Sequence, residues 1–475
     1  MDSLFMTMEE WLEGVELNYG IFCLLPIIVI LVIAVWRKTT FSALLAGVIL
    51  ACLMVAKFNP LVTVGLFLDE FYATACDDGT MWVLLVCGLF GALIQVMTDS
   101  GGVLGFTKIA KKLLNSRNKT LIGTWILGII IFIDDYLNCL AVGAATRPLS
   151  DEYKVSREMS SFIINSTGVT VCAIVPISSW GAFMSGLMEK AELTNGLSAF
   201  SAYCHAIPFM FYAIIAVIIV PLVACGILPM FKNMKAAERR AIETGEVLSE
   251  DSKKAVVEGL EDEERLKNKP HRALNFIIPI LIVVVMTILA DDMVVALVIA
   301  LVCTLVLYLP QRLMSLKEYI DSAMKGLTDM FGVLVIIIVG YMLIDLNAAL
   351  GVNEFVTAIC SAAVPSKLLP ALIFVGVGLL SLASGSFWGL AAIAFPIVGS
   401  VSGSLGLNPF LMSGVVVSAV AFGGHICLYS DTVILTSAAT QCTPSDYFRT
   451  SLPIILAYPF AIGVILFLVA GFIMC

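Results

Sequence analysis

Charged side chains are scarce in this sequence. Asp, Glu, Lys and Arg make up only 13% of the 475 residues, about half of their usual share in soluble domains, whereas hydrophobic residues make up 60%. So few charges cannot cover the water-exposed surface of a soluble protein of this length, which excludes that class. The 27 Lys and Arg against 36 Asp and Glu give a net charge of −9. Without a basic block, this charge also excludes nucleic-acid binding.

Several catalytic and metal-binding motifs are also missing. The 13 Cys form no CxxC pair, and most lie inside apolar runs, where Cys behaves as a small hydrophobic residue rather than a metal ligand. The absence of a GxxxxGK[ST] loop excludes a primary pump. The absence of a nucleophile elbow and of an HExxH motif argues against an intramembrane hydrolase. We therefore expect a protein that is not an enzyme and binds no cofactor.

Long apolar runs predict an all-α polytopic membrane protein. Runs such as Ile27–Trp36 and Phe276–Leu289 are continuous, unlike the alternating segments of about ten residues in a transmembrane β-barrel. Because Lys and Arg gather on the cytoplasmic side, their positions predict about ten spans and two re-entrant hairpins. Both termini are then outside, and residues 232–272 form a cytoplasmic loop of solvated helix or coil. We expect the protein in the plasma or inner membrane, in contact with lipid.

The two halves of the chain resemble each other weakly. At an offset of 250, the stretches 128–148 and 378–398 both break midway, at Asp134-Asp135-Tyr136 and at Ser384-Gly385-Ser386. The charge pattern gives the halves opposite orientations, and inverted repeats with discontinuous segments are common in secondary transporters. We predict an N-terminal segment with two peripheral spans (1–79), a first transport repeat (80–231), the loop (232–272), two more peripheral spans (273–327) and a second, inverted repeat (328–475). The peripheral spans offer a surface for a homodimer.

Acidic residues inside apolar runs are the strongest candidates for a functional site. A charge in the hydrocarbon region costs several kcal/mol, so such residues are functional by default. Asp134 and Asp135 are adjacent in the first half, and Asp431 lies in a span of the second half. Their carboxylates suit Na+ coordination or proton transfer, although a helix cap or a pair with Arg147 is the alternative. These three residues are the Na+ candidates, and Na+, H+ or both are the expected coupling ions.

Polar residues near the breaks complete the predicted ion or substrate site. Hydroxyls and freed carbonyl groups can coordinate a dehydrated cation, but small polar residues also simply connect helices. A histidine can carry protons near neutral pH, with a structural hydrogen-bonding role as the alternative. Besides the three aspartates, the predicted site contains Asn138, Asn165, Ser166, Thr167, Ser178, Ser384, Ser386, Trp388, His425, Ser430 and Thr432.

An ordered series of motifs resembles the NhaC-type Na+/H+ antiporter family of the ion transporter superfamily, over roughly residues 81–460. The series runs through Asp134-Asp135-Tyr136-Leu137-Asn138, Arg147-Pro148-Leu149-Ser150-Asp151, Ser178-Ser179-Trp180, Ser384-Gly385-Ser386-Phe387-Trp388-Gly389, Phe422-Gly423-Gly424-His425 and Ser430-Asp431-Thr432. The resemblance implies inverted repeats, re-entrant hairpins and coupling to Na+ or H+. The family also includes exchangers of organic anions and members that look like amino-acid transporters.

The chain departs from this family pattern at two positions. Asn165 stands where the family commonly has Asp before Ser-Thr, and Gly424 stands where it commonly has Asp before His. Losing both carboxylates leaves room for an organic substrate whose own charge replaces that of a side chain. We therefore predict a secondary transporter that exchanges Na+ for H+. The alternative is a Na+- or H+-coupled carrier of a small organic anion or amino acid.

Overall fold

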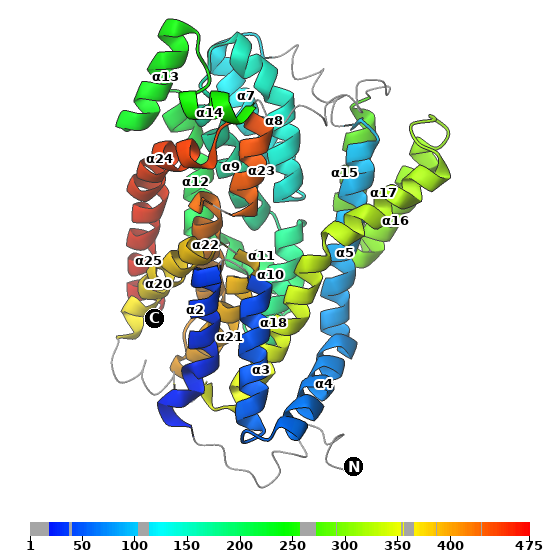
Figure 1. Ribbon diagram of the computed structural model, residues 1–475, viewed down its shortest axis with the longest axis vertical. Helices are drawn as coiled ribbons and strands as arrows, with labels where there is room; N and C mark the ends of the chain where they lie inside the picture. Colours follow the sequence, from blue (N-terminus) through cyan, green and yellow to red (C-terminus); the bar gives the residue numbers. More distant parts are fainter. Residues whose placement is uncertain are drawn as a thin grey trace.

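All regular elements that the structure describes are helices. The computed structural model describes residues 19–37, 40–102, 114–256, 272–290, 292–352, 355, 365–385, 387–428 and 430–475. Most of the helices run roughly along the long axis of the molecule (Figure 1). Large apolar side chains such as Trp36, Val306 and Ile473 are exposed on its outside, as expected for a surface that faces lipid.

The described helices follow the same order in the two halves of the chain. The first half contains α2 (Leu25–Arg37), α3 (Thr40–Val55), α4 (Pro60–Cys76), α5 (Asp78–Asp99), α7 (Arg117–Ile130), α8 (Asp135–Glu152), α9 (Arg157–Ile174), α10 (Ser179–Lys190), α11 (Ala199–Ala206) and α12 (Phe211–Ala224). The second half contains α15 (Leu274–Ala290), α16 (Met293–Tyr308), α17 (Leu316–Asp329), α18 (Phe331–Ala349), α20 (Leu369–Ser384), α21 (Phe387–Leu405), α22 (Pro409–Ile426), α23 (Asp431–Thr440), α24 (Pro444–Ile455) and α25 (Ala461–Met474).

The central helices of the two halves share one register. The first residues of α7 and α20, of α8 and α21, of α9 and α22, and of α10 and α23 all differ by 252. The matches at an offset of 250 are therefore two residues out of register with the helix ends. Helix ends depend on local caps and breaks, whereas short residue matches between apolar segments arise by chance.

Contacts between the halves are reciprocal. Helix α8 packs on α23, and its counterpart α21 packs on α10. In the same way α3 packs on α18 and α16 on α5, while α4 contacts α18 and α17 contacts α5. Helices α9 and α22 are buried along almost their whole lengths. They form the centre around which the other helices pack.

Helices α4 and α17 occupy segments for which the sequence predicts no span. Asn59 caps α4, and Ser315 forms a capping box with Glu318 at the start of α17, so each has a clear start signal. Helix α17 lies against α5 at very short range. A Cβ on Gly326 would stand 2.1 Å from the backbone oxygen of Gly91, so only glycine permits this contact between the two backbones.

Several described helices can cross a membrane. Five are long and apolar enough by themselves, or up to seven spans if each of two bent pairs counts as one. The pair α9 and α10 bends by 45°, and the pair Ala199–Phe209 and Phe211–Ala224 bends by 56°. Shorter apolar helices, among them α16, accompany them. The protein is thus a multi-pass membrane protein; the ten spans and two re-entrant hairpins stay predictions.

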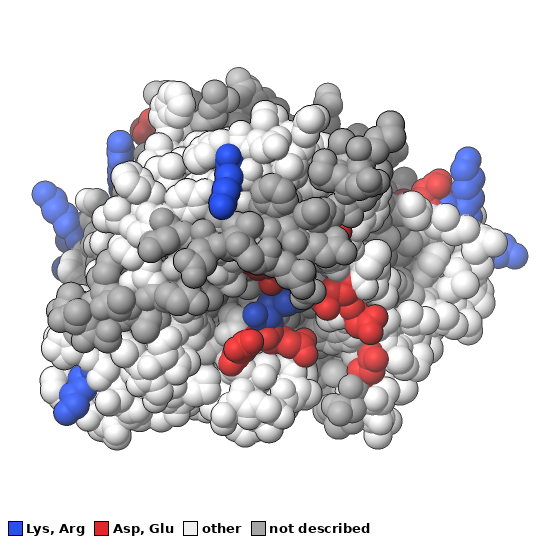
Figure 2. Space-filling model, turned by 90° about the horizontal axis from the view of Figure 1, so that it is seen from below, with Lys and Arg blue, Asp and Glu red and all other residues white. Residues whose placement is uncertain are grey.

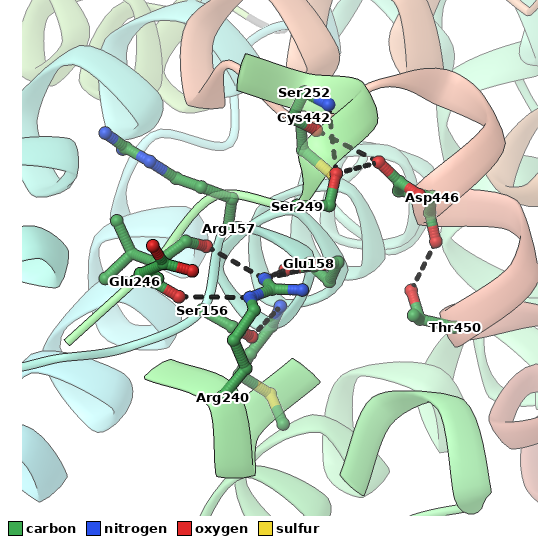
Figure 3. Close-up of polar contacts among 12 residues, drawn as sticks. Ser156, Arg157, Glu158, Arg240, Glu246, Ser249, Ser252, Cys442, Asp446 and Thr450 are labelled. Atoms are coloured by element: carbon green, nitrogen blue, oxygen red, sulfur yellow. Dashed lines mark hydrogen bonds and ion pairs between the residues drawn. The ribbon is translucent and has the colours of Figure 1, made fainter. Parts of the chain in front are cut away.

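Two helices connect the halves, α13 (Lys232–Thr244) and α14 (Glu250–Val256), and we call residues 232–256 the linker. Arg240 of the linker donates to both carboxylate oxygens of Glu158 at 2.9 Å (Figure 3). The hydroxyls of Ser249 and Ser252 bond Asp446 of α24 at 2.5 and 3.0 Å. Many residues of the linker are exposed, as expected for a solvated helix, while Arg240, Ser249 and Ser252 bond residues at the ends of the transmembrane helices. Residues 257–271 of the expected loop lie outside the described part.

The two ends of the molecule differ in their charged groups. The linker lies at the end opposite the start of α2 and the end of α25 (Figure 1). On that opposite face, acidic side chains gather beside a basic one in a hollow (Figure 2). Asp77, which caps α5, pairs with Lys190 at 3.0 Å. Partial burial raises the pKa of Asp77, but the N–H of Thr80 and the ammonium of Lys190 outweigh it, so the pKa lies below its ordinary value.

Candidate functional site

Four breaks in the helices meet in the middle of the protein. They lie between α7 and α8, α9 and α10, α20 and α21, and α22 and α23. The N–H of Ser179 donates to the carbonyl of Ile133 at 3.0 Å, which joins the first two breaks. The rings of Trp180 and Phe387 stack at 4.8 Å, which joins the second break to the third. Backbone without helical hydrogen bonds is tolerated at membrane depth only when it is buried in protein or lines a cavity.

Two serines hold corresponding breaks with the same hydrogen bonds. Ser178 caps α10 and donates to the carbonyl of Cys172 at 2.7 Å. Ser430, 252 residues later, caps α23 and donates to the carbonyl of Gly424 at 2.6 Å. Thr432 also reaches the Gly424 carbonyl, at 3.2 Å. Each serine therefore bonds a carbonyl six residues back that the broken helix leaves without its usual partner.

The two adjacent aspartates of the first half are buried and hydrogen-bonded. Asp134 caps α8, with one oxygen accepting from the N–H of Leu137 at 3.0 Å and the other from the hydroxyl of Ser179 at 2.9 Å. Asp135 accepts from the indole N–H of Trp180 at 3.0 Å. The side chains of Ser179 and Trp180 thus tie the start of α10 to these acids.

Asp431 of the second half meets the first half through a tyrosine. The hydroxyl of Tyr136, the residue after Asp135, donates to Asp431 at 2.9 Å. Tyr136 is half-buried and Asp431 is exposed. Of the three aspartates, Asp431 is therefore the one that solvent can reach. The three acids lie on helices whose Lys and Arg residues stand only at the ends far from the breaks. The middle of the site is therefore rich in acids and lacks fixed positive side chains.

Aromatic rings from both halves pack beside these acids. Besides stacking on Phe387, Trp180 lies 5.6 Å from Trp388, and Phe183 meets Trp388 edge-on at 4.8 Å. The indole N–H of Trp388 is buried and forms no well-aligned hydrogen bond in the described part of the chain. Trp388, a predicted site residue, thus joins Asp134, Asp135 and Asp431 in one group.

A second group of predicted residues surrounds His425 and contains no acid. One ring nitrogen of His425 meets the hydroxyl of Ser166 at 2.7 Å, and the other meets that of Tyr212 at 2.7 Å. Asn165 donates to the backbone oxygen of His425 at 2.7 Å and to the hydroxyl of Tyr447 at 2.9 Å. Tyr212 and Tyr447 were not among the predicted site residues, although a tyrosine in an apolar span signals that its hydroxyl needs a partner.

The other predicted residues have different surroundings. Asn138 donates to the carbonyls of Gly128 and Ile131, both at 2.6 Å, and its buried side-chain oxygen has no hydrogen-bond partner among the described residues. Thr167 bonds the carbonyl of Ile163 in its own helix at 2.8 Å. Ser384 ends α20, but its side chain lies outside the described part, as does the whole of Ser386.

The three aspartates do not form one all-carboxylate site. Among the described residues, no group of three His, Cys, Asp or Glu side chains lies close enough to hold a metal ion. A Na+ ion would need ligands of other kinds in addition, such as backbone carbonyls and the unpaired oxygen of Asn138.

Comparisons with known proteins agree with this architecture. The sequence profile of the Na+/H+ antiporter family matches residues 171–472, well over half of the chain. The chain belongs to the Na+/H+ antiporter family. The matched part of this family member includes Asp431 and His425, whereas Asp134 and Asp135 precede it.

Two further likenesses span nearly the whole family member. An uncharacterized protein of Haemophilus influenzae is 26% identical over an alignment of 481 positions that takes in 93% of this chain and 89% of the relative. The YdaH transporter of Alcanivorax borkumensis superposes with a TM-score of 0.52 over 85% of this chain and 88% of that one, at 13% identity. The latter likeness concerns the fold alone. With the family match, these findings identify a membrane transporter.

Proposed function

We propose that this transporter exchanges Na+ for H+ by alternating access through a site between two inverted repeats. The observation that carries the proposal is the hydrogen bond from Tyr136 to Asp431 at 2.9 Å. It brings the acids of both halves together at breaks in the helices, where discontinuous spans of secondary transporters bind their ions. The shared register and the reciprocal contacts of the two halves support the inverted repeat.

The acids differ in the roles that their surroundings suit. Asp431 is exposed and is the first acid that an entering cation meets. Asp135 is buried beside Asp134. Two adjacent negative carboxylates repel each other, so binding a cation or a proton is favourable there. Competition between Na+ and H+ for the same carboxylates couples their opposite movements. The unpaired oxygen of Asn138 supplies a neutral ligand one helical turn from Asp134.

A coupled carrier of a small organic solute is the second candidate. Asn165 and Gly424 stand where the resemblance implies acids, and the hydrogen bonds around His425 run only between uncharged partners. This part of the site therefore has no carboxylate to bind Na+. An organic solute that brings its own charge fits such a site.

Proteoliposomes with an enclosed pH-sensitive dye test the exchange. We expect a Na+ gradient to drive proton flux, and Asp135→Asn and Asp431→Asn to reduce the flux at least about tenfold, because each removes a charge that the ions share. The matched control is Glu243→Gln, which changes an exposed acid of α13 and should leave the flux unchanged. Absence of Na+-driven flux in the wild type would refute the exchange. Full flux in Asp135→Asn would remove that residue from the mechanism.

A further inference from the structure

Carboxylates and aromatic rings alternate where the two halves meet. Asp135 bonds the indole of Trp180 at 3.0 Å, and this ring lies 5.6 Å from Trp388. Tyr136, which follows Asp135, bonds Asp431 at 2.9 Å. These five residues come from α8, α10, α21 and α23, and we call them the acidic–aromatic group. The two indoles are buried, whereas Tyr136 is half-buried and Asp431 is exposed.

The aromatic members distinguish this group from a site for Na+ alone. Na+ is a hard cation that takes oxygen ligands, and aromatic rings supply none. Rings of Trp and Tyr instead attract organic ammonium ions through their negative faces, best of all when the cation is desolvated. Carboxylates add charge-assisted hydrogen bonds to the N–H groups of the same ligand. A carboxylate flanked by Trp and Tyr is therefore suited to an ammonium group on a carbon skeleton.

The charge around the group favours a cation over an organic anion. From residue 120 to 146, from 158 to 189 and from 368 to 448, the sequence contains no Lys or Arg. Asp134, Asp135 and Asp431 are the acids near the breaks, and the ring of His425 hydrogen-bonds to the hydroxyls of Ser166 and Tyr212. An organic anion without an amino group would meet carboxylates and no fixed cation. This repulsion disfavours the organic-anion form of the second candidate function.

One donor of the group is left unused. The indole N–H of Trp388 is buried, with the residue 6% exposed; it lies beside the hydroxyl of Tyr136 but forms no well-aligned hydrogen bond in the described part of the chain. A buried N–H without a partner is costly, and a ligand oxygen would relieve this cost. A solute that carries both an ammonium group and an oxygen acceptor would satisfy Asp431 and Trp388 together.

We propose that the acidic–aromatic group binds the ammonium group of a small organic solute, with Asp431 as its carboxylate partner and Trp180, Trp388 and Tyr136 as its aromatic walls. This inference rests on the proposed transport function, because it names the class of solute that the same site would carry. Amines and amino acids belong to this class.

Isothermal titration calorimetry on the purified full-length protein tests the inference. The probes are n-butylammonium, its matched anion butyrate, and the common L-amino acids, at constant Na+ concentration and pH. We expect at least one ammonium-bearing probe to bind and butyrate not to bind. Trp388→Phe keeps a weaker aromatic ring and should raise the Kd slightly, whereas Trp388→Leu should raise it about 2- to 30-fold, the range of a cation–π contact.

The control variant is Trp125→Leu. Trp125 lies on α7, and its indole N–H bonds the carbonyl of Val217 at 2.9 Å, away from the acidic–aromatic group. Its replacement should leave the Kd unchanged, and thermal unfolding of each variant identifies any loss of fold. Asp431→Asn should abolish binding of the ammonium probe while the protein stays folded. Equal binding of butyrate and butylammonium, binding by no ammonium-bearing probe, or an unchanged Kd in Trp388→Leu would overturn the inference.

The two proposals fail in different experiments. Na+-driven proton flux without any binding of an ammonium-bearing probe would overturn this inference and leave the exchange standing. Binding of such a probe that Asp431→Asn abolishes, in a protein that shows no Na+-driven proton flux, would support the ammonium site and refute the exchange.

Discussion

Three aspartates that look equivalent in the sequence have unequal surroundings. Both oxygens of Asp134 accept hydrogen bonds, from Leu137 and Ser179, and the residue caps α8. Asp135 is as deeply buried, and its oxygens accept from the indole of Trp180 and from the N–H of Tyr136. Asp431 alone among the three is exposed. We infer that Asp134 mainly orients the break, while Asp135 and Asp431 meet the transported cation.

His425 offers a residue-scale test of whether the imidazole carries protons. Its two ring nitrogens meet the hydroxyls of Ser166 and Tyr212, an arrangement that a neutral ring satisfies with one donor and one acceptor. His425→Gln removes at least one of these bonds and should lower the stability by about 1–3 kcal/mol. The midpoint of the pH dependence of transport should not move.

The pH profile of transport in proteoliposomes and thermal unfolding in detergent measure the two effects. His205→Gln is the matched control, because His205 is exposed on α11 and bonds only the carbonyl of Ser201. It should change neither quantity. A shifted or lost pH midpoint in His425→Gln would show that this histidine titrates during transport.

At the scale of elements, specific side-chain hydrogen bonds stabilise the breaks between helices. Ser178 and Ser430 each cap the helix that follows a break and bond the carbonyl six residues earlier. One side chain thus replaces hydrogen bonds on both sides of the interruption. This is why the chain can leave the helical path at membrane depth without stranding several polar groups.

Ser178→Ala should therefore destabilise the protein by about 1–2 kcal/mol, through the lost cap and the carbonyls left without a donor. Ser430→Ala should have a similar effect, and Ser178→Thr, which keeps the hydroxyl, a smaller one. Thermal unfolding of the purified variants gives the order. Ser198→Ala removes the cap of α11 at the surface and should cost less; an equal or larger loss there would contradict the role of the break.

At the scale of the molecule, the linker fastens the two halves together at one end. Its helix α13 bonds the start of α9 through Arg240 and Glu158, and its Ser249 and Ser252 bond Asp446 on α24. The carbonyl of Val247 also accepts a hydrogen bond from the N–H of Arg157, which lies in the first turn of α9 and has no acceptor within that helix. The linker therefore packs as part of the transmembrane structure.

Arg240→Ala should lower the stability by about 3 kcal/mol, because the side chain of Glu158 is only 3% exposed and a buried charge that loses its partner is costly. The double variant Arg240→Met with Glu158→Gln should recover most of this loss, since it leaves no buried charge. Chemical or thermal unfolding of the wild type, Arg240→Met, Glu158→Gln and the double variant gives the coupling between the two residues.

The neighbouring Arg239 serves as the comparison for this prediction. It pairs with Glu243 at 3.8 Å while both side chains are about two-thirds exposed. Arg239→Ala should therefore change the stability by less than about 1 kcal/mol. If Arg240→Ala costs no more than Arg239→Ala, the linker does not fasten the halves through this ion pair.

Much of the fold was predictable because its signals are local. Scarce charge and continuous apolar runs predict a helical membrane protein. The acids Asp134 and Asp135 lie within an apolar run, which makes them candidate functional residues. The membrane class and the helical fold are confirmed by the structure and the family match. Helices α4 and α17 were not predicted as such, since acids and lysines hide their apolar faces from a search for continuous runs.

The sequence by itself determined the class of the protein and indicated two of the four breaks, at Asp134-Asp135-Tyr136 and at Ser384-Gly385-Ser386, whereas Asp431, at the break before α23, was expected inside a span. Hydropathy, helix caps and helix breaks each depend on a few neighbouring residues, so they can be recognised in the sequence. Only the tertiary structure decided that Tyr136 meets Asp431, that Tyr212 meets His425 and that the linker pairs with Glu158. These partners are separated by 295, 213 and 82 residues. A contact over such separations depends on how all the intervening helices pack, and it leaves no local pattern in the sequence.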